Sequence, residues 1–562
     1  MNMILWEPAL RLVALWMPSL IILSSLGWLG RRYLLWKHSP LQSLPGSKES
    51  FWLGALLSLH REALYEPAKR WWAQAEKQSP NDPVRALSFS TVLGSMNVML
   101  LDTKLIKEVL LSRPGRMERR VRVLAPVMGS TSVFTADGSQ WMHQRQRLQP
   151  AFAMYLVKET LPSIAVDHTR RLIQAWSRVA EPRMEIEVQS HMSALTVDIM
   201  GQALFAHDFH GVDAVETWAQ RNEESANKLD THTTIDLDDE LIQSLQACFQ
   251  PSLIMLLAHI TGQSWWLLYV SPRLRKSVHA LNRAADQVID KNRQAVQDSR
   301  NRKQQEHNDD RNTSLLHMML QESMTTDVAT NKHMNAHTHP PKSTPMSQVE
   351  LRDTVKTFMM AGHETTATWC NWAIYALVKQ PADIQEKLYK DISQHASSDP
   401  NATIDLEVVE KMEYLHAFLQ EVLRMYPPVA GVIRTTIHDE SLDGIQIPAG
   451  TRLVMPQYLL HRHPKYWDNP ESFEPERWMQ KGTAKDAFQE RIRFAFFPFG
   501  AGSHHCFGYR FATIEAKIIV AELVRAFRFT LAPSQKNTTF EFRSFISSQP
   551  KPDLKVTIQS RS

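Results

Sequence analysis

Apolar residues recur at helical spacing through most of the chain. Between residues 140 and 425 the segments are long and mixed, with few glycines, and this pattern predicts helices. Two stretches, Val84 to Leu100 and Ile433 to Val454, are richer in β-branched residues. The second contains the turn signals Asp443-Gly444 and Pro448-Ala449-Gly450. The pattern therefore predicts a mainly α fold with small β-sheets.

The N-terminal segment has a different character. Leu12 to Gly30 carries no charge and, at ~1.5 Å rise per residue, is long enough to cross a bilayer as a helix. Arg31, Arg32 and Lys37 follow at once, so the positive-inside rule places the C-terminal bulk in the cytosol. A cleaved signal peptide is the competing interpretation, which the long apolar run and the position of the cations disfavour. Residues 1–39 are thus predicted to be a single-pass membrane anchor with its basic flank.

A turn-prone segment follows this predicted anchor. Pro40 and Leu44-Pro45-Gly46-Ser47 indicate a stiff hinge over residues 40–50. The remaining residues, 51–562, suffice to bury a large core around a cofactor. Within them, the polar stretch 327–347 holds histidines without the acidic or cysteine partners of a closed metal site, which favours a surface insertion.

Composition narrows the possible function classes. Hydrophobic residues make up 43% and charged residues 22% of the chain, as in an ordinary globular protein. The net charge of +4 is too weak and too scattered to favour nucleic acid as a partner. The three cysteines, Cys248, Cys370 and Cys506, lie far apart, which argues against a disulfide framework and for a reducing compartment.

Cys506 is the strongest candidate for chemistry. It lies in Phe499-Gly500-Ala501-Gly502-Ser503-His504-His505-Cys506-Phe507-Gly508, ahead of a predicted helix. The glycines let the backbone curl so that amide N–H groups face the sulfur, and the helix presents its positive end, which suits a thiolate directed at a metal. The alternatives are an inert buried cysteine, a dinucleotide loop and a cysteine nucleophile. His505 in place of a glycine disfavours the second, and the tight Cys–His spacing disfavours the third.

Four further patterns contain polar residues at spacings that indicate a shared position or function. Residues three or four apart share one helix face, and consecutive threonines in a helix are unfavourable unless a hydroxyl is wanted there. Some of these patterns are weak signals when taken alone. They are Trp141-x-x-x-Arg145, Ala361-Gly362-His363-Glu364-Thr365-Thr366, Glu421-x-x-Arg424 with the later Phe473-Glu474-Pro475-Glu476-Arg477-Trp478, and Pro427-Pro428-Val429 followed by Arg434.

In order and spacing, these patterns together resemble the cytochrome P450 family of haem-thiolate monooxygenases. The resemblance covers one large domain from about residue 40 to the end. It implies a large helical domain with small β-sheets enclosing haem b, here preceded by the N-terminal transmembrane helix. The family loop F-x-x-G-x-[RH]-x-C-x-G is filled by Phe499, Gly502, His504, Cys506 and Gly508.

The resemblance assigns haem-binding roles. It implies that the Cys506 thiolate is the axial ligand of the iron. Trp141 and Arg145 would lie on the helix that binds the haem propionates, and Arg434 would supply another propionate partner. His504 stands where many members have arginine, so pairing with a propionate there would depend on pH. The segment Val429 to Ile433 would line the substrate pocket.

It also assigns roles to the two helical motifs. Thr365 would donate a hydrogen bond to dioxygen, and Glu364 would be its acidic partner in proton delivery. Gly362 would leave space for the helix to bulge there. Glu421, Arg424 and Arg477 would form a buried charge triad with a structural role.

The activity implied is that of a monooxygenase. One oxygen atom of O2 would enter an apolar organic substrate by hydroxylation or epoxidation, with electrons from NADPH through a separate reductase, because too few residues follow Gly508 for a flavin domain. The alternatives are a haem-thiolate isomerase or dehydratase acting on peroxides, relatives that typically lack the threonine present here as Thr365, and a non-catalytic haem-binding protein. Fatty acids, terpenoids, sterols and xenobiotics all fit as substrates. Ala361 stands where many fatty-acid ω-hydroxylases carry a haem-esterifying glutamate.

Membrane lipid is the other expected partner. The anchor implies an endoplasmic reticulum protein with its catalytic domain in the cytosol. The cluster Trp265-Trp266-Leu267-Leu268-Tyr269 lies where the family has the loop between its F and G helices. It is either a second membrane contact or part of the core, because Trp and Tyr suit both settings.

Overall fold

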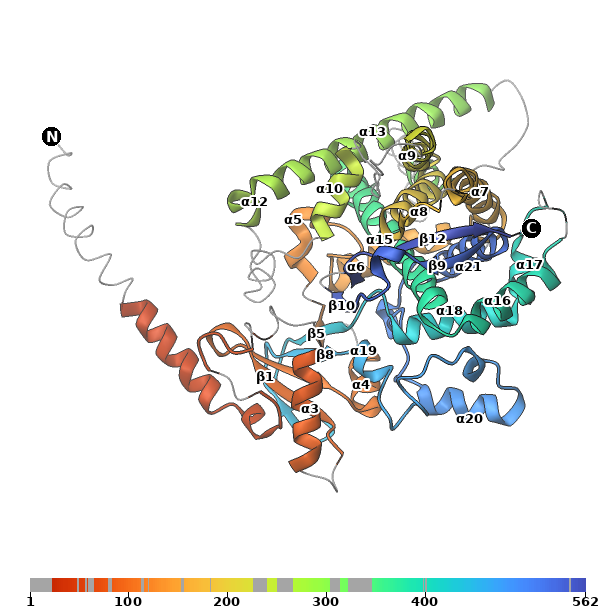
Figure 1. The fold of residues 1–562 in the computed structure, drawn as a ribbon. Coiled ribbons are helices and arrows are strands. Elements are labelled where there is room, and N and C mark those ends of the chain that lie inside the picture. Colours follow the sequence, from red (N-terminus) through yellow and green to blue (C-terminus); the bar gives the residue numbers. More distant parts are fainter. Residues whose placement is uncertain are drawn as a thin grey trace, which may run out of the picture. The chain divides into compact units, whose positions relative to one another are not determined.

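The computed structural model describes residues 23–47, 50–55, 58, 65–78, 83–112, 116–119, 121–152, 156–181, 183–225, 240–249, 266–303, 314–321, 346–397, 399, 402–544 and 547–561 (Figure 1). Within them the fold is mainly helical with small sheets, which confirms the prediction. Two compact units form the chain. One comprises Met1–Glu118 with Ile433–Pro456, and the other Arg119–Val432 with Gln457–Ser562.

The first unit is built on a five-stranded sheet. Strand β2 (Met96–Leu100) pairs antiparallel with β1 (Ala86–Ser90) and parallel with β8 (Arg452–Met455). The sheet continues through β5 (Val432–Thr436) to β3 (Met117–Glu118), in the order β1-β2-β8-β5-β3. Both stretches predicted to be β therefore form strands, and they share one sheet although they are far apart in sequence.

Besides the helix over residues 23–37, the described part of this unit contains a short hairpin and two helices. The hairpin joins β6 (Glu440–Leu442) to β7 (Ile445–Ile447) through Asp443 and Gly444, with φ of 45° and 88°. Asp-Gly suits such a two-residue turn because both positions need positive φ. The helices are α3 (Glu66–Gln78) and α4 (Thr103–Leu110).

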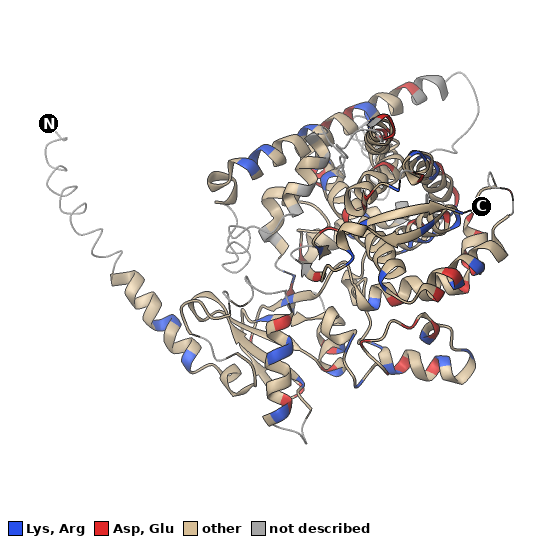
Figure 2. Ribbon diagram, viewed as in Figure 1, with Lys and Arg blue, Asp and Glu red and all other residues tan. Residues whose placement is uncertain are grey.

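The second unit holds most of the helices. Its core lies around α15, which packs against α8, α13 and α21. Acidic and basic residues are interspersed along its surface helix α20 (Gly482–Ile492), as Figure 2 shows. The longer helices are α6 (Gly138–Leu148), α7 (Leu161–Ala180), α8 (Val188–Phe205), α9 (Gly211–Ser225), α10 (Glu240–Phe249), α13 (Pro272–Lys303), α15 (Gln348–Lys379), α16 (Ala382–His395), α17 (Leu406–Lys411), α18 (Glu413–Met425) and α21 (Tyr509–Ala526).

Helix α15 carries the Ala361–Thr366 motif and begins at a capping box. The Ser347 hydroxyl accepts from the Glu350 N–H at 3.2 Å, and the Glu350 carboxylate accepts from the Ser347 N–H at 2.9 Å. The helix is continuous through the motif. A Cβ at Gly362 would lie 2.8 Å from Cγ of Met200 on α8. This glycine therefore permits close helix packing in this structure, and the space for a bulge that we expected beside it is filled.

Two small sheets lie in the C-terminal part of the second unit. Strand β12 (Lys555–Ser560) pairs with β9 (Phe527–Leu531) and with β4 (Ile186–Glu187). A separate hairpin pairs β10 (Glu541–Ser544) with β11 (Ser548–Lys551). Strand β11 packs against α15 and so reaches the helix that carries the threonine motif.

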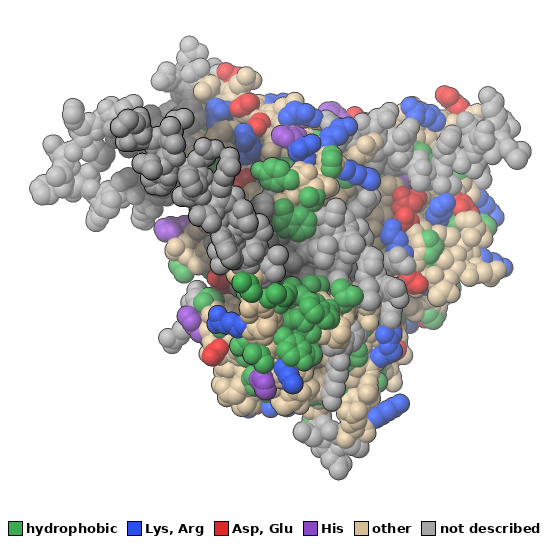
Figure 3. Space-filling model, turned by 90° about the vertical axis from the view of Figure 1, so that its left-hand side faces the viewer, with side chains coloured by type: hydrophobic (Ala, Val, Ile, Leu, Met, Phe, Trp, Pro, Cys, Tyr) green, Lys and Arg blue, Asp and Glu red, His purple; other side chains and the backbone are tan. Residues whose placement is uncertain are grey.

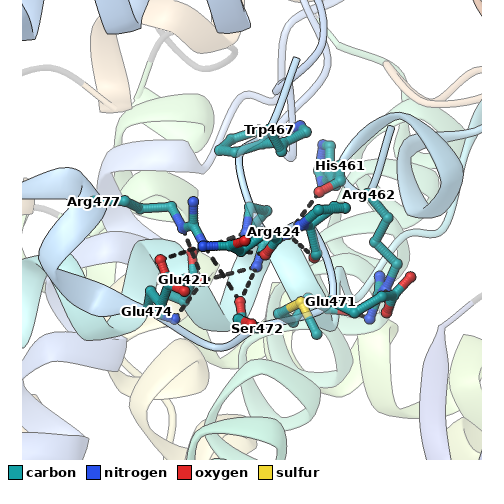
Figure 4. A network of polar contacts seen from close by, with 12 residues as sticks. Glu421, Arg424, His461, Arg462, Trp467, Glu471, Ser472, Glu474 and Arg477 are labelled. Carbon is teal, nitrogen blue, oxygen red and sulfur yellow. Dashed lines mark hydrogen bonds and ion pairs between the residues drawn. The ribbon is translucent and has the colours of Figure 1, made fainter. Parts of the chain in front are cut away.

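The predicted charge triad is present and fully buried (Figure 4). Arg424 on α18 forms a bidentate pair with Glu421, with Nε–Oε2 at 2.9 Å and Nη2–Oε1 at 2.8 Å. Arg477, on the 3₁₀ turn η6 (Pro475–Trp478), donates from Nε to the same Glu421 Oε1 at 3.1 Å. Trp478 Nε1 donates to the other oxygen at 2.9 Å. These bonds compensate the buried carboxylate.

The structure does not support the predicted membrane-spanning helix. Residues 12–22 of the expected span lie outside the described residues, and residues 23–37 form a helix. Across the described ranges, no helix is both long and apolar enough to cross a bilayer.

Two other expectations fall wholly or partly outside the described residues. The polar stretch 327–347 is described only at residues 346 and 347, and Trp265 lies outside. In the remainder of its cluster, Leu267 is buried whereas Tyr269 is 76% exposed. Leu267 is therefore part of the core, whereas the exposed Tyr269 is available for a membrane contact.

Candidate functional site

The Cys506 loop folds as its glycines require. Gly500 and Gly502 both adopt φ of 71°, a left-handed conformation that costs glycine nothing. The turn lets the Cys506 N–H donate to the Phe499 carbonyl at 2.8 Å. The Gly508 N–H faces the sulfur, and α21 begins at the next residue. The loop thus surrounds the sulfur with the backbone and helix dipoles expected for a thiolate.

Opposing effects act on the Cys506 thiol. The residue is exposed in part, yet the protein atoms packed around the sulfur disfavour the thiolate and raise its pKa above the usual value. The Gly508 N–H and the charge of Arg145 act the other way and lower the pKa. Burial raises the pKa of Cys248 to about 12, although the charge of Lys356 lowers it. Cys370 is also buried, and its pKa is raised well above the usual value. Only Cys506 combines exposure with groups that stabilise the anion.

Helix α6 brings Trp141 and Arg145 to this loop. The Trp141 ring lies 3.9 Å from the His504 ring, centroid to centroid. Arg145 donates from Nη1 to the His505 carbonyl at 3.0 Å, and its Cζ lies 5.2 Å from the centre of the Phe507 ring. The structure therefore gathers three predicted haem-binding side chains beside the candidate ligand.

A further cation, which sequence reasoning missed, joins this group. Arg119 Cζ lies 5.8 Å from the Trp141 ring, and Nε pairs with Asp137 at 3.2 Å. Burial lowers the Arg119 pKa, and the charge of Arg145 lowers it further. No motif marks Arg119, because tertiary packing alone brings it to Trp141.

The side chains around Cys506 fit a haem. In the part of the chain that the structure describes, no three His, Cys, Asp or Glu side chains cluster as around a protein-held metal. A single cysteine thiolate is the protein ligand of the iron in haem-thiolate proteins, and Cys506 can supply it. Arg145 is partly buried and makes no ion pair with any described acidic residue, which fits a propionate partner. A Cβ at Gly508 would meet no atom within 4 Å, so there is open space next to this glycine of the loop.

The threonine motif lies on the neighbouring helix. Thr365 is partly buried, and its hydroxyl donates to the Ala361 carbonyl at 3.0 Å. Thr366 faces Glu515 on α21, whose pKa burial raises well above the usual range. Phe499 of the Cys506 loop contacts Trp369 one turn further along α15, with ring centroids 6.0 Å apart. These contacts connect the motif to both the loop and the helix that follows it.

Glu364 points toward β11. Its side chain is buried, and its Oε1 accepts from the Ser547 hydroxyl at 2.8 Å and from Gln549 Nε2 at 2.6 Å. Burial raises the pKa of Glu364 to about 7, and the bonds from Ser547 and Gln549 limit that rise because they stabilise the carboxylate. A group with this pKa can gain and lose a proton near neutral pH.

Arg434 lies in the other unit, on β5. Its Nη1 donates to the Ile433 carbonyl at 2.9 Å. Its expected role as a propionate partner stays a prediction.

Replacing Glu364 by glutamine should change how stability depends on pH. The folded-state pKa of about 7 lies above the ordinary 4.5, so the folded state holds an extra proton between these values and wild-type stability falls as pH rises through them. The glutamine has no proton to lose. The free energy of unfolding of wild type relative to Glu364→Gln should therefore fall by about 2–3 kcal/mol between about pH 5 and about pH 8. Urea titrations across this range measure it. A constant difference would contradict the assignment.

Comparisons with known proteins agree with this geometry. The family model described as cytochrome P450 matches residues 88–556. The chain is 27% identical to LUTEIN DEFICIENT 5, chloroplastic, of Arabidopsis thaliana, over 79% of this chain and 67% of that protein. It is 28% identical to cytochrome P450 4A11 of Homo sapiens, over 78% and 75%. It is 26% identical to cytochrome P450 monooxygenase sphH of Aspergillus fumigatus, over 88% and 84%.

Proposed function

Since the chain belongs to the cytochrome P450 family, whose members are oxygenases that bind haem through a cysteine thiolate, we propose that Cys506 supplies this thiolate in a monooxygenase acting on an apolar organic substrate. The observation that carries the proposal is the loop itself. Backbone N–H groups, the start of α21 and Arg145 all surround one partly exposed cysteine. The bound haem supplies the activation of O2.

The protein's first task is to hold and orient the haem. Cys506 would bind the iron, and the partly buried Arg145 would pair with a propionate through a charge-assisted bond. Trp141 and His504, whose ring centroids lie 3.9 Å apart with the planes tilted by 47°, would fix this end of the macrocycle. Arg119, which is partly buried beside Trp141, would add a second cation, and Arg434 would be a further propionate partner.

The second task is to deliver protons while bulk water is excluded. The Thr365 hydroxyl lies on the partly buried face of α15 and donates to the Ala361 carbonyl at 3.0 Å, and it would turn from that carbonyl to donate to the reacting oxygen. Glu364 exchanges protons near neutral pH and passes them toward that hydroxyl. The apolar segment Val429 to Ile433 lines the substrate side, which favours substrates without charge.

The test uses the purified holoprotein with an NADPH-dependent reductase under ¹⁸O-labelled O2. We expect one labelled oxygen atom in the product and strict dependence on NADPH and the reductase. A peroxide isomerase or dehydratase would form product without the reductase, and a non-catalytic haem protein would form none. Candidate substrates are first ranked by the spectral shift that follows displacement of water from the iron.

We also propose that the N-terminal segment holds the protein at the endoplasmic reticulum membrane. Large apolar side chains of the first unit are exposed, among them Leu23 at 65% and Trp52 at 60%. Hydrophobic side chains gather on one face of the protein (Figure 3). Arg31 and Arg32 follow the apolar run, which places the catalytic bulk in the cytosol. Patches of this kind mark membrane or protein contacts.

A protein lacking residues 1–39 tests the membrane proposal. It should leave the integral membrane fraction and still incorporate haem, because the proposed haem ligands lie elsewhere in the chain. Fractionation in high salt and then in detergent separates integral from peripheral binding. Retention in the integral fraction would contradict the proposal, and a native N-terminus processed near residue 30 would establish a signal peptide instead.

A further inference from the structure

The surroundings of Glu364 show an asymmetry between its two oxygen atoms. Ser547 Oγ and Gln549 Nε2 both donate to Oε1, at 2.8 Å and 2.6 Å. The other oxygen, Oε2, lies 3.8 Å from Nε2 of His363. Two donors to one oxygen leave no room for a proton there. When the carboxyl is protonated, its hydrogen therefore sits on Oε2.

The two donors are fixed in place by the residue between them. The Ser548 N–H donates to the Pro428 carbonyl at 2.8 Å, and its hydroxyl donates to the Pro427 carbonyl. The Ser548 carbonyl accepts from Trp372 Nε1 on α15 at 2.8 Å. This anchoring fixes Ser547 and Gln549 against α15, so Glu364 meets preformed donors.

His363 is the titratable side chain that lies beside Oε2. His363 Nδ1 lies 2.6 Å from the Met359 carbonyl, which can only accept, so Nδ1 carries the hydrogen. Burial lowers the pKa of His363 to about 4, which keeps the ring neutral and Nε2 unprotonated near neutral pH. At 3.8 Å this nitrogen is too far from Oε2 for a hydrogen bond, and the neutral ring places no positive charge beside that oxygen. Among the described residues, Lys551 on β11 is the charged group that acts on Glu364, and it lowers the pKa of that carboxyl.

We propose that Ser547 and Gln549 are positioning residues for Glu364, which hold Oε1 so that this acid carries and exchanges its proton through Oε2. The proposal deepens the proton-delivery role of Glu364 and rests on that proposed function for its catalytic consequence. Which oxygen atom of Glu364 carries the proton can be measured without measuring turnover.

The first measurement is infrared spectroscopy of the holoprotein as a function of pH. The carbonyl band of protonated Glu364 is identified by its loss in Glu364→Gln. In Gln549→Leu we expect this band to move to higher frequency, because the carbonyl oxygen Oε1 loses a donor. Its titration midpoint should rise by about one pH unit, because the carboxylate loses a charge-assisted bond. Ser547→Ala should act in the same direction, which provides a second, smaller change should Gln549→Leu fold poorly.

The matched control is Gln446→Leu, which removes an exposed amide that donates to Ser441 at 3.3 Å. It should leave the Glu364 band and midpoint unchanged. A band that keeps its frequency and midpoint in both Gln549→Leu and Ser547→Ala would overturn the proposal.

A second measurement tests whether the bonds from Ser547 and Gln549 to Glu364 affect catalysis. The ratio of product to NADPH consumed is followed against pH, and its midpoint should move with the infrared midpoint in Gln549→Leu. A ratio whose midpoint stays in place while the infrared midpoint moves would overturn the positioning role. If Glu364→Gln keeps the wild-type ratio of product to NADPH at every pH, the proposed proton-delivery function of Glu364 fails. The infrared shift still decides which oxygen atom of Glu364 is held by Ser547 and Gln549.

Discussion

Replacing Arg424 by methionine should lower the free energy of unfolding by about 3–5 kcal/mol, because it breaks a buried ion pair at one partner. All five N–H groups of the Arg424 guanidinium are used. Two bind the Glu421 carboxylate, and three bind the carbonyls of His461, Pro470 and Ser472, at 2.9, 2.7 and 2.7 Å. Methionine fills similar volume but removes all five of these bonds, and the Glu421 carboxylate keeps the bonds from Arg477 and Trp478 (Figure 4). Urea unfolding followed by circular dichroism measures the loss.

Arg491→Met is the matched control. Arg491 pairs with Asp468 at 2.6 Å, but the two side chains are 37% and 73% exposed. Exposed pairs of this kind contribute about 0–1 kcal/mol, so the same substitution should have little effect. Arg424→Lys should fall between the two, because it keeps the charge but loses the planar fork that binds both oxygens. Equal stability of Arg424→Met and Arg491→Met would contradict a structural role for the triad.

Thr365→Ala should uncouple NADPH consumption from product formation. The alanine keeps the helix and the apolar character of the site, so substrate binding and electron input should continue. Without the hydroxyl, protons reach the reacting oxygen less efficiently, and general acid assistance of this kind is typically worth ~10²–10⁴-fold in rate. We expect NADPH to be consumed, more hydrogen peroxide to be released and much less product to form. Parallel assays of NADPH, peroxide and product measure the partition.

Thr366→Ala provides the neighbouring control on the same helix. The Thr366 hydroxyl faces Glu515 on α21 rather than the proposed proton path, so coupling should change much less than in Thr365→Ala. Unchanged coupling in Thr365→Ala would contradict its assignment as the donor. It would leave Thr366 or an ordered water molecule in that role.

Local patterns were sufficient to predict much of the fold. Helical periodicity located α15, and β-branched residues with Asp443-Gly444 located the strands and the hairpin of the first unit. The pairing of β2 with β8 was not predictable, because it joins segments distant in the chain. Gly362 was misread for a related reason. A glycine in a helix signals space, and only the packed structure shows that Met200 of α8 fills it.

Some residues of the candidate site were predictable from the sequence, and others were not. Motif spacing identified Cys506, Trp141, Arg145 and His504, and the structure places them together. Arg119 carries no motif, and its place beside Trp141 depends on tertiary packing. The bonds from Ser547 and Gln549 to Glu364 connect residues far apart in the chain through a packed hairpin, so no sequence period could signal them.

The absorption spectrum of the reduced protein with carbon monoxide tests the central claim, that the Cys506 thiolate binds the haem iron, most directly. Wild type should absorb far to the red of a histidine-ligated haem. Cys506→Ala should lose this band, and Cys248→Ala and Cys370→Ala should keep it because both thiols are buried and protonated. Persistence of the band in Cys506→Ala would contradict the account and point to one of the other two cysteines as the ligand.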